Sequence, residues 1–372
     1  MKTNKLRVAL SLFFIFLITC VCSVETLAYD TEDEYCKASS FDNNEDIIEA
    51  LSNNVKVESR LYELLFGDGR NKSALKLIPG GEIFGVKIKQ SRVTVTDAKG
   101  VPALKCGDVI LSINGERVES VNDVKRILAA GGGESVTVRA LHCGNELGIE
   151  IRPTLVDGEY RLGLSLRDGA AGIGTVTFID PASGLFGGLG HGICDSDTGE
   201  VVPMESGVAT GAILGGVHKG ECGKPGELTG ILTDEVKGTL TVNSDCGVFG
   251  ILSTPDTSRT AISIAPHTEV VAGEAKIIST VKNGKTAEYK IEIFDIDRNS
   301  TGSKSFRIRV TDEALKAMTG GIVRGMSGSP IIQNGKLVGA VTHVMVANPT
   351  EGYGIFIENM LNAAENTVPK AA

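Results

Sequence analysis

The sequence predicts a mainly β protein in which two folded domains follow an N-terminal export segment. The length of 372 residues suits two or three domains of ordinary size. Stretches rich in Val, Ile and Thr recur at strand length, separated by turns rich in glycine, of which the chain has 46. Hydrophobic residues make up 42% of the chain, enough for a real core. The net charge is −9 and no basic stripe is present, which argues against nucleic acid as a partner.

The export segment is predicted at residues 1–28. Lys2, Lys5 and Arg7 precede an uncharged apolar run from Val8 to Val24. A basic stretch before such a run is typical of an export signal, and its length lies between a signal-peptide core and a membrane-spanning helix. The sequence is compatible with a cleaved signal peptide and with a single membrane anchor. We favour slightly an anchor that keeps the basic flank inside, with the rest of the chain exported.

Residues 29–76 are predicted to form an acidic spacer. The stretch begins YDTEDEYCKASSFDNNED, which indicates a solvated segment next to the membrane. An exposed, flexible segment of this kind is suited to proteolysis. Export permits disulfides, but the sequence does not choose among the possible pairings, and no metal site is predicted. The cysteines beyond the export segment are Cys36, Cys106, Cys143, Cys194, Cys222 and Cys246.

The first folded domain is predicted at residues 77–156. A strand, DVILSI, runs into the turn Asn114-Gly115, which is a strong hairpin signal. A short helix follows, with Ser120 or Asn122 as its N-cap. The segment LKCGDVILSINGERVESVNDVKRIL resembles closely the most recognisable part of PDZ domains.

A PDZ domain implies a peptide-binding site. In this class a peptide adds a strand to a sheet edge beside a glycine-rich loop, and clustered amides of the loop bind the terminal carboxylate. The loop expected here is Gly81-Glu82-Ile83-Phe84-Gly85. Glu82 would repel a carboxylate, so an internal peptide is an alternative ligand. A PDZ domain that serves only as a rigid spacer is the second alternative.

The second folded domain is predicted at residues 157–372 as a barrel or sandwich, because many short strands recur without helices between them. The stretch GLGHGI encloses His191 between glycines, which permit a sharp turn and open access to the ring. Histidine can accept and donate a proton near neutral pH, so His191 is a candidate general base. A structural histidine is the alternative, and the glycine pattern favours the base.

The stretch GMSGSP, followed by the hairpin IIQNGKLVGAVTH, predicts a nucleophile loop. A serine at the tip of a glycine turn has a fixed position and an exposed hydroxyl. The N–H groups of Gly325 and Ser327 can converge as an oxyanion hole. The pattern Gly-x-Ser-Gly-x-Pro resembles the nucleophile motif of chymotrypsin-like proteases, which makes Ser327 the candidate nucleophile. Ser329 is expected to support the turn or to line the pocket.

An acidic residue that orients the histidine completes such a triad. The order His, Asp, Ser along the chain is that of chymotrypsin, and ordinary spacing in that class favours Asp234 or Asp245. Spacing alone does not decide the choice. The candidates after His191 are Asp195, Asp234, Asp245, Asp295, Asp297 and Asp312.

A family resemblance covers nearly everything after the spacer. The order of export segment, acidic spacer, PDZ domain and protease, with the stretches AAGIGTVTFIDP, GLGHGICD and GGIVRGMSGSPIIQNGKLVGAVTHVMVANPTEGYGIFIENML, resembles the stage IV sporulation protein B family of serine peptidases from endospore-forming bacteria. The resemblance implies a chymotrypsin-like double β-barrel. It implies His191 as the base, Ser327 as the nucleophile and Asp312 as the acid, with Asp245 as the second choice. It requires no metal and no cofactor.

The resemblance also implies a biological role. Members are exported into the space between the two membranes around the forespore and cleave themselves free of their N-terminal anchor. They cleave a membrane-bound regulator of an intramembrane protease and so activate a late sigma factor. The expected partners are therefore protein substrates, including the chain itself, and the membrane. The alternative is a non-enzymatic PDZ scaffold or signalling protein with a degenerate protease fold. HtrA proteases share both domains but place the PDZ domain after the protease.

Overall fold

The computed structural model describes residues 75–195 and 199–366. The export segment predicted at residues 1–28, and all but the last two residues of the predicted spacer, lie outside this range. Among the helices that the structure describes, none is long and apolar enough to cross a membrane.

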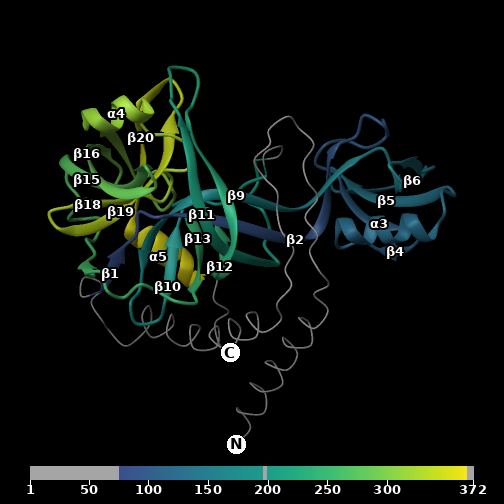
Figure 1. The fold of residues 1–372 in the computed structure, drawn as a ribbon, viewed down its shortest axis with the longest axis horizontal. Helices are drawn as coiled ribbons and strands as arrows, with labels where there is room; N and C mark the ends of the chain where they lie inside the picture. The colour runs from purple at the N-terminus through teal and green to yellow at the C-terminus, as the bar shows by residue number, and fades with distance from the viewer. Residues whose placement is uncertain (1–74, 196–198, 367–372) are drawn as a thin grey trace, which may run out of the picture. The chain divides into compact units, whose positions relative to one another are not determined.

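Strands dominate the described residues (Figure 1). The first are β1 (Lys76–Pro79), β2 (Ile83–Asp97), β3 (Val109–Ile113), β4 (Glu116–Arg117), β5 (Val136–His142), β6 (Asn145–Ile151), β7 (Thr154–Val156) and β8 (Glu159–Arg161). Next come β9 (Ser165–Ile179), β10 (Leu185–Gly188), β11 (Ser206–His218), β12 (Glu227–Ser244), β13 (Gly247–Leu252) and β14 (Ile262–Ser263). The last are β15 (Gly273–Lys282), β16 (Lys285–Ile296), β17 (Phe306–Val310), β18 (Pro330–Gln333), β19 (Lys336–Met345) and β20 (Asn348–Phe356). The described helices are α3 (Val121–Ala130), α4 (Glu313–Thr319) and α5 (Ile357–Asn366).

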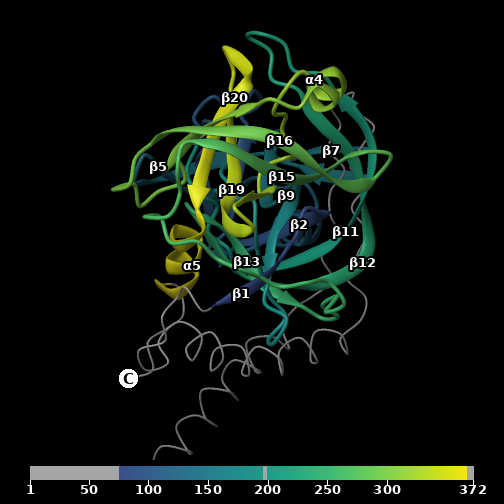
Figure 2. The same cartoon turned by 90° about the vertical axis from the view of Figure 1, so that its left-hand side faces the viewer.

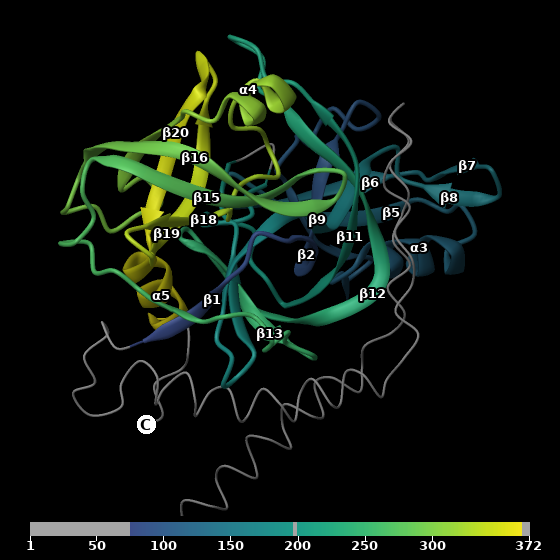
Figure 3. The same ribbon diagram turned by 60° about the vertical axis from the view of Figure 1, so that its left-hand side comes forward.

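The C-terminal strands close into an antiparallel barrel in the order β15-β16-β17-β20-β19-β18 (Figure 2). Its core is aliphatic and aromatic, with the rings of Phe306 and Phe356 5.3 Å apart. The predicted hairpin turn between β18 and β19 is confirmed, since Asn334 and Gly335 have φ values of +52° and +76°, as a tight turn between twisted strands requires. α5 packs against β19 and β20 (Figure 3).

A second ring of antiparallel strands forms from β2, β9, β10, β13, β12 and β11, and it closes because β9 also pairs with β2. Its core includes Phe84 and Phe186, whose rings meet edge to face at 5.6 Å. Two such barrels, each built from strands with buried and exposed sides, form the chymotrypsin-like double-barrel architecture that the resemblance implied.

The PDZ domain has its own core, which extends from Val93 to Leu162. Along the chain, this core lies between the part of β2 and the part of β9 that pair within the barrel. The first parts of β2 and the last parts of β9 pair within the barrel, whereas Thr94 to Asp97 of β2 pair with Ser165 to Arg167 of β9 beside the PDZ core. Residues 77–89, which were assigned to the PDZ domain from sequence, therefore pair with barrel strands.

The helix of the PDZ domain begins where the sequence indicated. Ser120 is the N-cap of α3; its hydroxyl accepts from the Asp123 N–H at 3.1 Å, while the Asp123 carboxylate accepts from the Ser120 N–H at 3.0 Å. This reciprocal capping box satisfies two amides that have no partner inside the helix. The buried face of α3 covers the PDZ core with Val121, Val124 and Leu128.

Candidate active site

The predicted nucleophile loop joins α4 to β18 in the C-terminal barrel and lies against β9 of the other barrel. Gly328 has φ +93°, and a Cβ added there would lie 2.0 Å from the Thr175 carbonyl oxygen. The Thr175 N–H donates to the Ser327 carbonyl oxygen at 3.0 Å, and its hydroxyl donates to the Gly325 carbonyl oxygen at 2.9 Å. The Thr177 hydroxyl donates to the Gly328 carbonyl oxygen at 2.7 Å. Two threonines of β9 thus hold a loop in which only glycine fits at position 328.

The two serines of the loop have different environments. Ser327 is half-buried and lines a cavity of about 530 Å³. Ser329 is fully buried, and its hydroxyl hydrogen-bonds the Ser279 hydroxyl at 3.0 Å. A serine sealed in the core cannot meet a peptide, so of the two only Ser327 is accessible to a substrate.

The N–H groups of Gly325 and Ser327 have no recorded hydrogen-bond acceptor within the described chain. Other amides of the same loop are paired: that of Gly328 donates to Val341 and that of Ser329 to Met326. Gly325 and Ser327 are half-buried and line the cavity, where their amides could meet a substrate. This agrees with the oxyanion hole expected from sequence, which stays a prediction.

His191 follows β10 in the N-terminal barrel and is held by a strained turn. Leu189 and Gly190 have φ values of +66° and +67°, and positive φ in a leucine is uncommon. Across the turn, a Cβ added at Gly192 would lie 2.8 Å from the Ser244 carbonyl oxygen. The glycines around the histidine therefore permit close packing as well as access.

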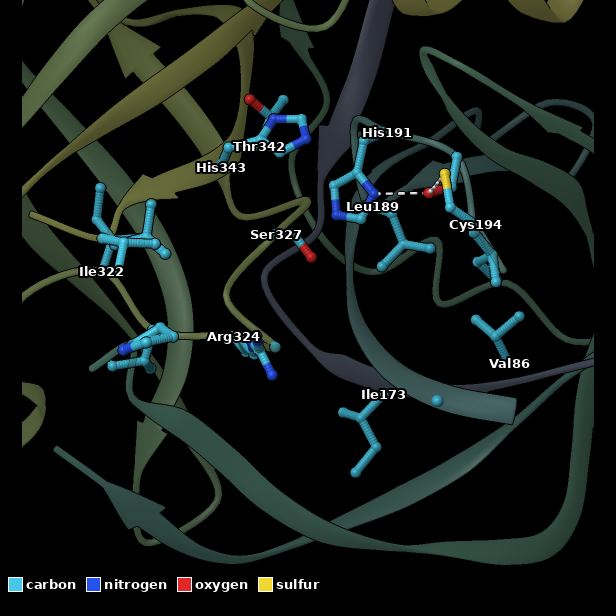
Figure 4. Close-up of a pocket in the computed structure, with 18 of the residues that line it drawn as sticks. Val86, Ile173, Leu189, His191, Cys194, Ile322, Arg324, Ser327, Thr342 and His343 are labelled. Atoms are coloured by element: carbon cyan, nitrogen blue, oxygen red, sulfur yellow. Dashed lines mark hydrogen bonds between the residues drawn. The ribbon is translucent and has the colours of Figure 1, made fainter. Parts of the chain in front are cut away.

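His191 and Ser327 line the same cavity from opposite barrels (Figure 4). His191 Nδ1 lies 2.8 Å from the Gly192 carbonyl oxygen. A carbonyl can only accept, so Nδ1 carries the proton and Nε2 has the free lone pair that a base needs. Burial lowers the pKa of His191 below its usual 6.5, partly opposed by this hydrogen bond, so the ring is neutral at pH 7.

A second histidine in the cavity was missed from sequence. His343 lies on β19, and its ring centroid is 5.1 Å from that of His191 (Figure 4). Burial lowers the pKa of His343 to about 4, helped by the charges of His191 and Lys304. Its Nδ1 is buried without a hydrogen-bond partner. Its position in the sequence could have indicated it, because His343 lies on β19, which pairs with β18, the strand that follows the nucleophile loop.

The structure does not bring Asp312 to His191. Asp312 is the N-cap of α4, and its carboxylate accepts from the Leu315 N–H at 3.0 Å and from the Lys290 N–H at 3.3 Å. Its charge contributes to raising the pKa of Tyr289, after burial. No hydrogen bond between His191 and Asp312 is recorded in the described residues, so the assignment of Asp312 as triad acid stays a prediction.

Asp245, the second choice, lies on the side of the His191 loop. It is exposed in the turn between β12 and β13, and its charge contributes, after burial, to raising the pKa of Cys194, which lines the cavity, and of Cys246. No hydrogen bond from Asp245 to His191 is recorded either.

The remaining aspartate candidates lie elsewhere. Asp195 is buried and forms an ion pair with Arg167 of β9. Asp234 is exposed on β12. Asp295 lies 3.7 Å from Arg307, and Asp297 accepts from a neighbouring N–H in the turn after β16. None of these residues lines the cavity of Ser327.

The loop predicted to bind the PDZ ligand has a different place. Residues Gly81–Gly85 lead into β2, where Gly85 pairs with Ile173 of β9 and Thr210 of β11 in the barrel. Glu82 forms an ion pair with Arg259, and Phe84 packs in the barrel core. The prediction and the structure differ because glycines in a sequence do not show which role they have. They can allow strands to pack closely, as here, or they can form an anion-binding loop.

At the start of β9, one edge of the strand has no strand partner recorded among the described residues. Residues Ser165 to Arg167 pair with β2 on one side, and α3 packs beside them. The Val121 N–H at the start of α3 donates to the Asp168 carboxylate at 2.8 Å. The residues that precede this edge, Arg161-Leu162-Gly163-Leu164, include a glycine with φ +75° that could have been recognised as a turn in the sequence.

No group of three or more His, Cys, Asp or Glu side chains is placed to hold a metal among residues 75–195 and 199–366. The five cysteines in these residues form no disulfide with one another. The cavity instead holds a serine and a neutral histidine, with two amides beside the serine, and this arrangement is suited to acyl transfer.

Comparison with family models gives two matches. Residues 103–141 match the PDZ domain, and residues 158–361, more than half of the chain, match the SpoIVB peptidase S55 model. Fold, site and matches together define a serine endopeptidase with a PDZ domain. The chain belongs to the SpoIVB peptidase S55 family.

The comparison with solved structures gives matches to a PDZ domain and to proteases. The PDZ domain of an SdrC-like protein from Listeria monocytogenes is 25% identical and covers 22% of this chain and 93% of its own, with a TM-score of 0.20. The active form of the Rv3671c protease from M. tuberculosis is 13% identical and covers 67% and 86%, with a TM-score of 0.32. A serine endoprotease from Yersinia pestis is 13% identical and covers 53% and 58%, also at 0.32. The comparison with curated proteins gave no match.

Proposed function

We propose that this peptidase is a sporulation signalling enzyme, exported to the space between the forespore membranes. It cleaves itself and a membrane-bound regulator of an intramembrane protease, which leads to activation of a late sigma factor. The family match supports the role, and one observation supports the chemistry: Ser327 and His191 come from different barrels and line one cavity. The N-terminal apolar run, as anchor, would keep the enzyme at the membrane until self-cleavage.

In the proposed mechanism His191 Nε2 takes the proton of Ser327 Oγ as the oxygen attacks the scissile carbonyl carbon. The N–H groups of Gly325 and Ser327 stabilise the oxyanion of the tetrahedral intermediate. The protonated His191 then gives its proton to the leaving amine. A water molecule, deprotonated by His191, hydrolyses the acyl-enzyme and restores Ser327.

The hydrogen bond to the Gly192 carbonyl supports this order of proton transfers, because it selects the tautomer of His191 in which Nε2 is the base. In most triads a carboxylate does this and also stabilises the imidazolium. Asp312 is the residue that the family resemblance indicates, and Asp245 is nearer to the His191 loop through its electrostatic contact with Cys194. Replacing each of the two aspartates by asparagine distinguishes between them, since only the triad acid should lose most of kcat.

The PDZ domain is proposed to bind an extended peptide at the start of β9. Strand addition there would extend the sheet on the side of β9 that faces α3. Titration with a peptide ligand should move the backbone amide resonances of Leu164 to Arg167 and of α3. Changes confined to Gly81–Gly85 would contradict this location.

The proposed function is tested with the full-length chain in membranes. Ser327→Ala should abolish self-processing and cleavage of a membrane-bound substrate in trans, a loss of about 10³-fold or more in rate. Ser329→Ala is the matched control in the same loop: it removes the hydroxyl bonded to Ser279, at a cost of about 1–3 kcal/mol of stability, and should keep substantial activity. Processing that persists in Ser327→Ala would show that another residue is the nucleophile.

A further inference from the structure

Most of the side chains that line the cavity beside Ser327 are apolar, and one of the others is a cation. Its walls include Ile173, Ile193, Ile322 and Val344. Among the described residues that line it, Arg324 is the only one with a formal charge, given that both histidines are neutral at pH 7. Figure 4 shows Arg324 between Ser327 and Ile173. A peptide that reaches Ser327 therefore passes a guanidinium in mostly apolar surroundings.

The backbone of Arg324 is fixed, while its side chain is left without a partner. The Arg324 N–H donates to the Gly226 carbonyl at 2.9 Å, and the Leu228 N–H donates to the Arg324 carbonyl at 2.8 Å. The side chain is exposed, and within the described chain no hydrogen bond or ion pair of its guanidinium is recorded. Glu227 lies across the strand bridge from Arg324, yet the two do not form an ion pair.

We propose that Arg324 selects substrates with an acidic residue within about three positions of the scissile bond. A guanidinium offers a planar pair of donors that matches a carboxylate, and the exposure of Arg324 leaves these donors accessible to a peptide. The apolar walls would take the neighbouring apolar side chains of the same peptide. The inference rests on the proposed peptidase activity of Ser327 and adds the class of substrate.

The chain itself carries a matching sequence. Residues 29–46, YDTEDEYCKASSFDNNED, hold seven carboxylates and one lysine. Self-cleavage, which the proposed function requires, would have to occur between the apolar run and the folded domains, and this stretch lies there. The charge of Arg324 is complementary to it.

The test measures kcat/KM of the full-length enzyme on quenched peptides derived from residues 29–46. The peptides differ at one position at a time, with each Asp or Glu replaced by its amide or by Lys. At the position that Arg324 contacts, the acidic peptide should be cleaved about 10- to 100-fold better than its amide counterpart. Arg324→Gln should reduce this ratio to about 1, Arg324→Lys should keep part of it, and Arg324→Glu should favour the Lys peptide.

The matched control is Lys219→Gln, which removes the same charge from an exposed residue outside the cavity. It should leave the ratio unchanged, whereas an equal fall in both variants would assign the preference to net charge and overturn the proposal. A wild-type ratio near 1, or one unaffected in Arg324→Gln, would overturn it while the peptidase function stands. A wild-type enzyme that cleaves no peptide, its own segment included, would instead contradict the proposed function itself.

Discussion

The contact between the nucleophile loop and β9 can be tested by adding one methyl group. Gly328→Ala places a Cβ at 2.0 Å from the Thr175 carbonyl oxygen and 2.5 Å from the Leu189 N, in a backbone conformation with φ +93°. Both obstacles are main-chain atoms, so no side-chain rotation can relieve them. The loop must move away from β9, and Ser327 moves with it.

The magnitude follows from two contributions. Left-handed backbone costs an alanine about 1–2 kcal/mol, and overpacking costs about 1–3 kcal/mol more, so Gly328→Ala should lose about 2–5 kcal/mol in the free energy of unfolding. Gly335→Ala is the control, with φ +76° and no atom within 4 Å of the added Cβ. Only the backbone contribution applies there, so it should lose about 1–2 kcal/mol.

The assay is urea unfolding of both variants, followed by peptidase kinetics below the unfolding transition. A shift of about 1 Å in Ser327 should reduce kcat/KM of Gly328→Ala by about 100-fold, while Gly335→Ala stays near wild type. Equal losses of stability in the two variants, with full activity in Gly328→Ala, would refute the claim that β9 holds the loop.

Two further predictions concern His191 and its acid. Because burial lowers the pKa of His191, kcat/KM should stay on its plateau at pH 7 and fall only as the pH drops through a midpoint below 6.5, where the base becomes protonated. A midpoint at or above 7 in the pH profile would instead indicate that a carboxylate faces the ring. Because Asp312 accepts from two backbone amides, Asp312→Asn should keep the cap of α4, whereas Asp312→Ala should lose about 0.5–2 kcal/mol in a thermal or urea melt. A loss of about 10⁴-fold in kcat for a folded Asp312→Asn, with Asp245→Asn unaffected, would make Asp312 the triad acid.

Local patterns were sufficient to predict much of the site. His191 between glycines and Ser327 in its glycine turn are both short-range signals, and the structure brings them to one cavity. The different environments of Ser327 and Ser329 were also predicted, because Ser329 stands next to Pro330, where the buried strand β18 begins. The Asn334-Gly335 turn was readable because only a few residue types accept positive φ at both central positions.

The pairing of strands that are far apart in the sequence could not be predicted from local patterns. The segment around Gly85 has the glycines of a loop, yet it forms a barrel strand because β9, nearly ninety residues later, pairs with it. His343 and Arg324 carry no local motif and acquire their place only when two barrels close around the cavity. Asp312 shows the opposite case, since its local role as a helix N-cap could have been inferred from the sequence that follows it.

The central claim is that Ser327 is the nucleophile. Labelling the full-length wild-type enzyme with a fluorophosphonate and mapping the modified residue by mass spectrometry tests it most directly. The account predicts one labelled residue, Ser327, and loss of labelling in Ser327→Ala and in His191→Ala, because the hydroxyl then lacks its base. Labelling at Ser329 or at a serine outside the cavity, or unchanged labelling of Ser327→Ala, would contradict it.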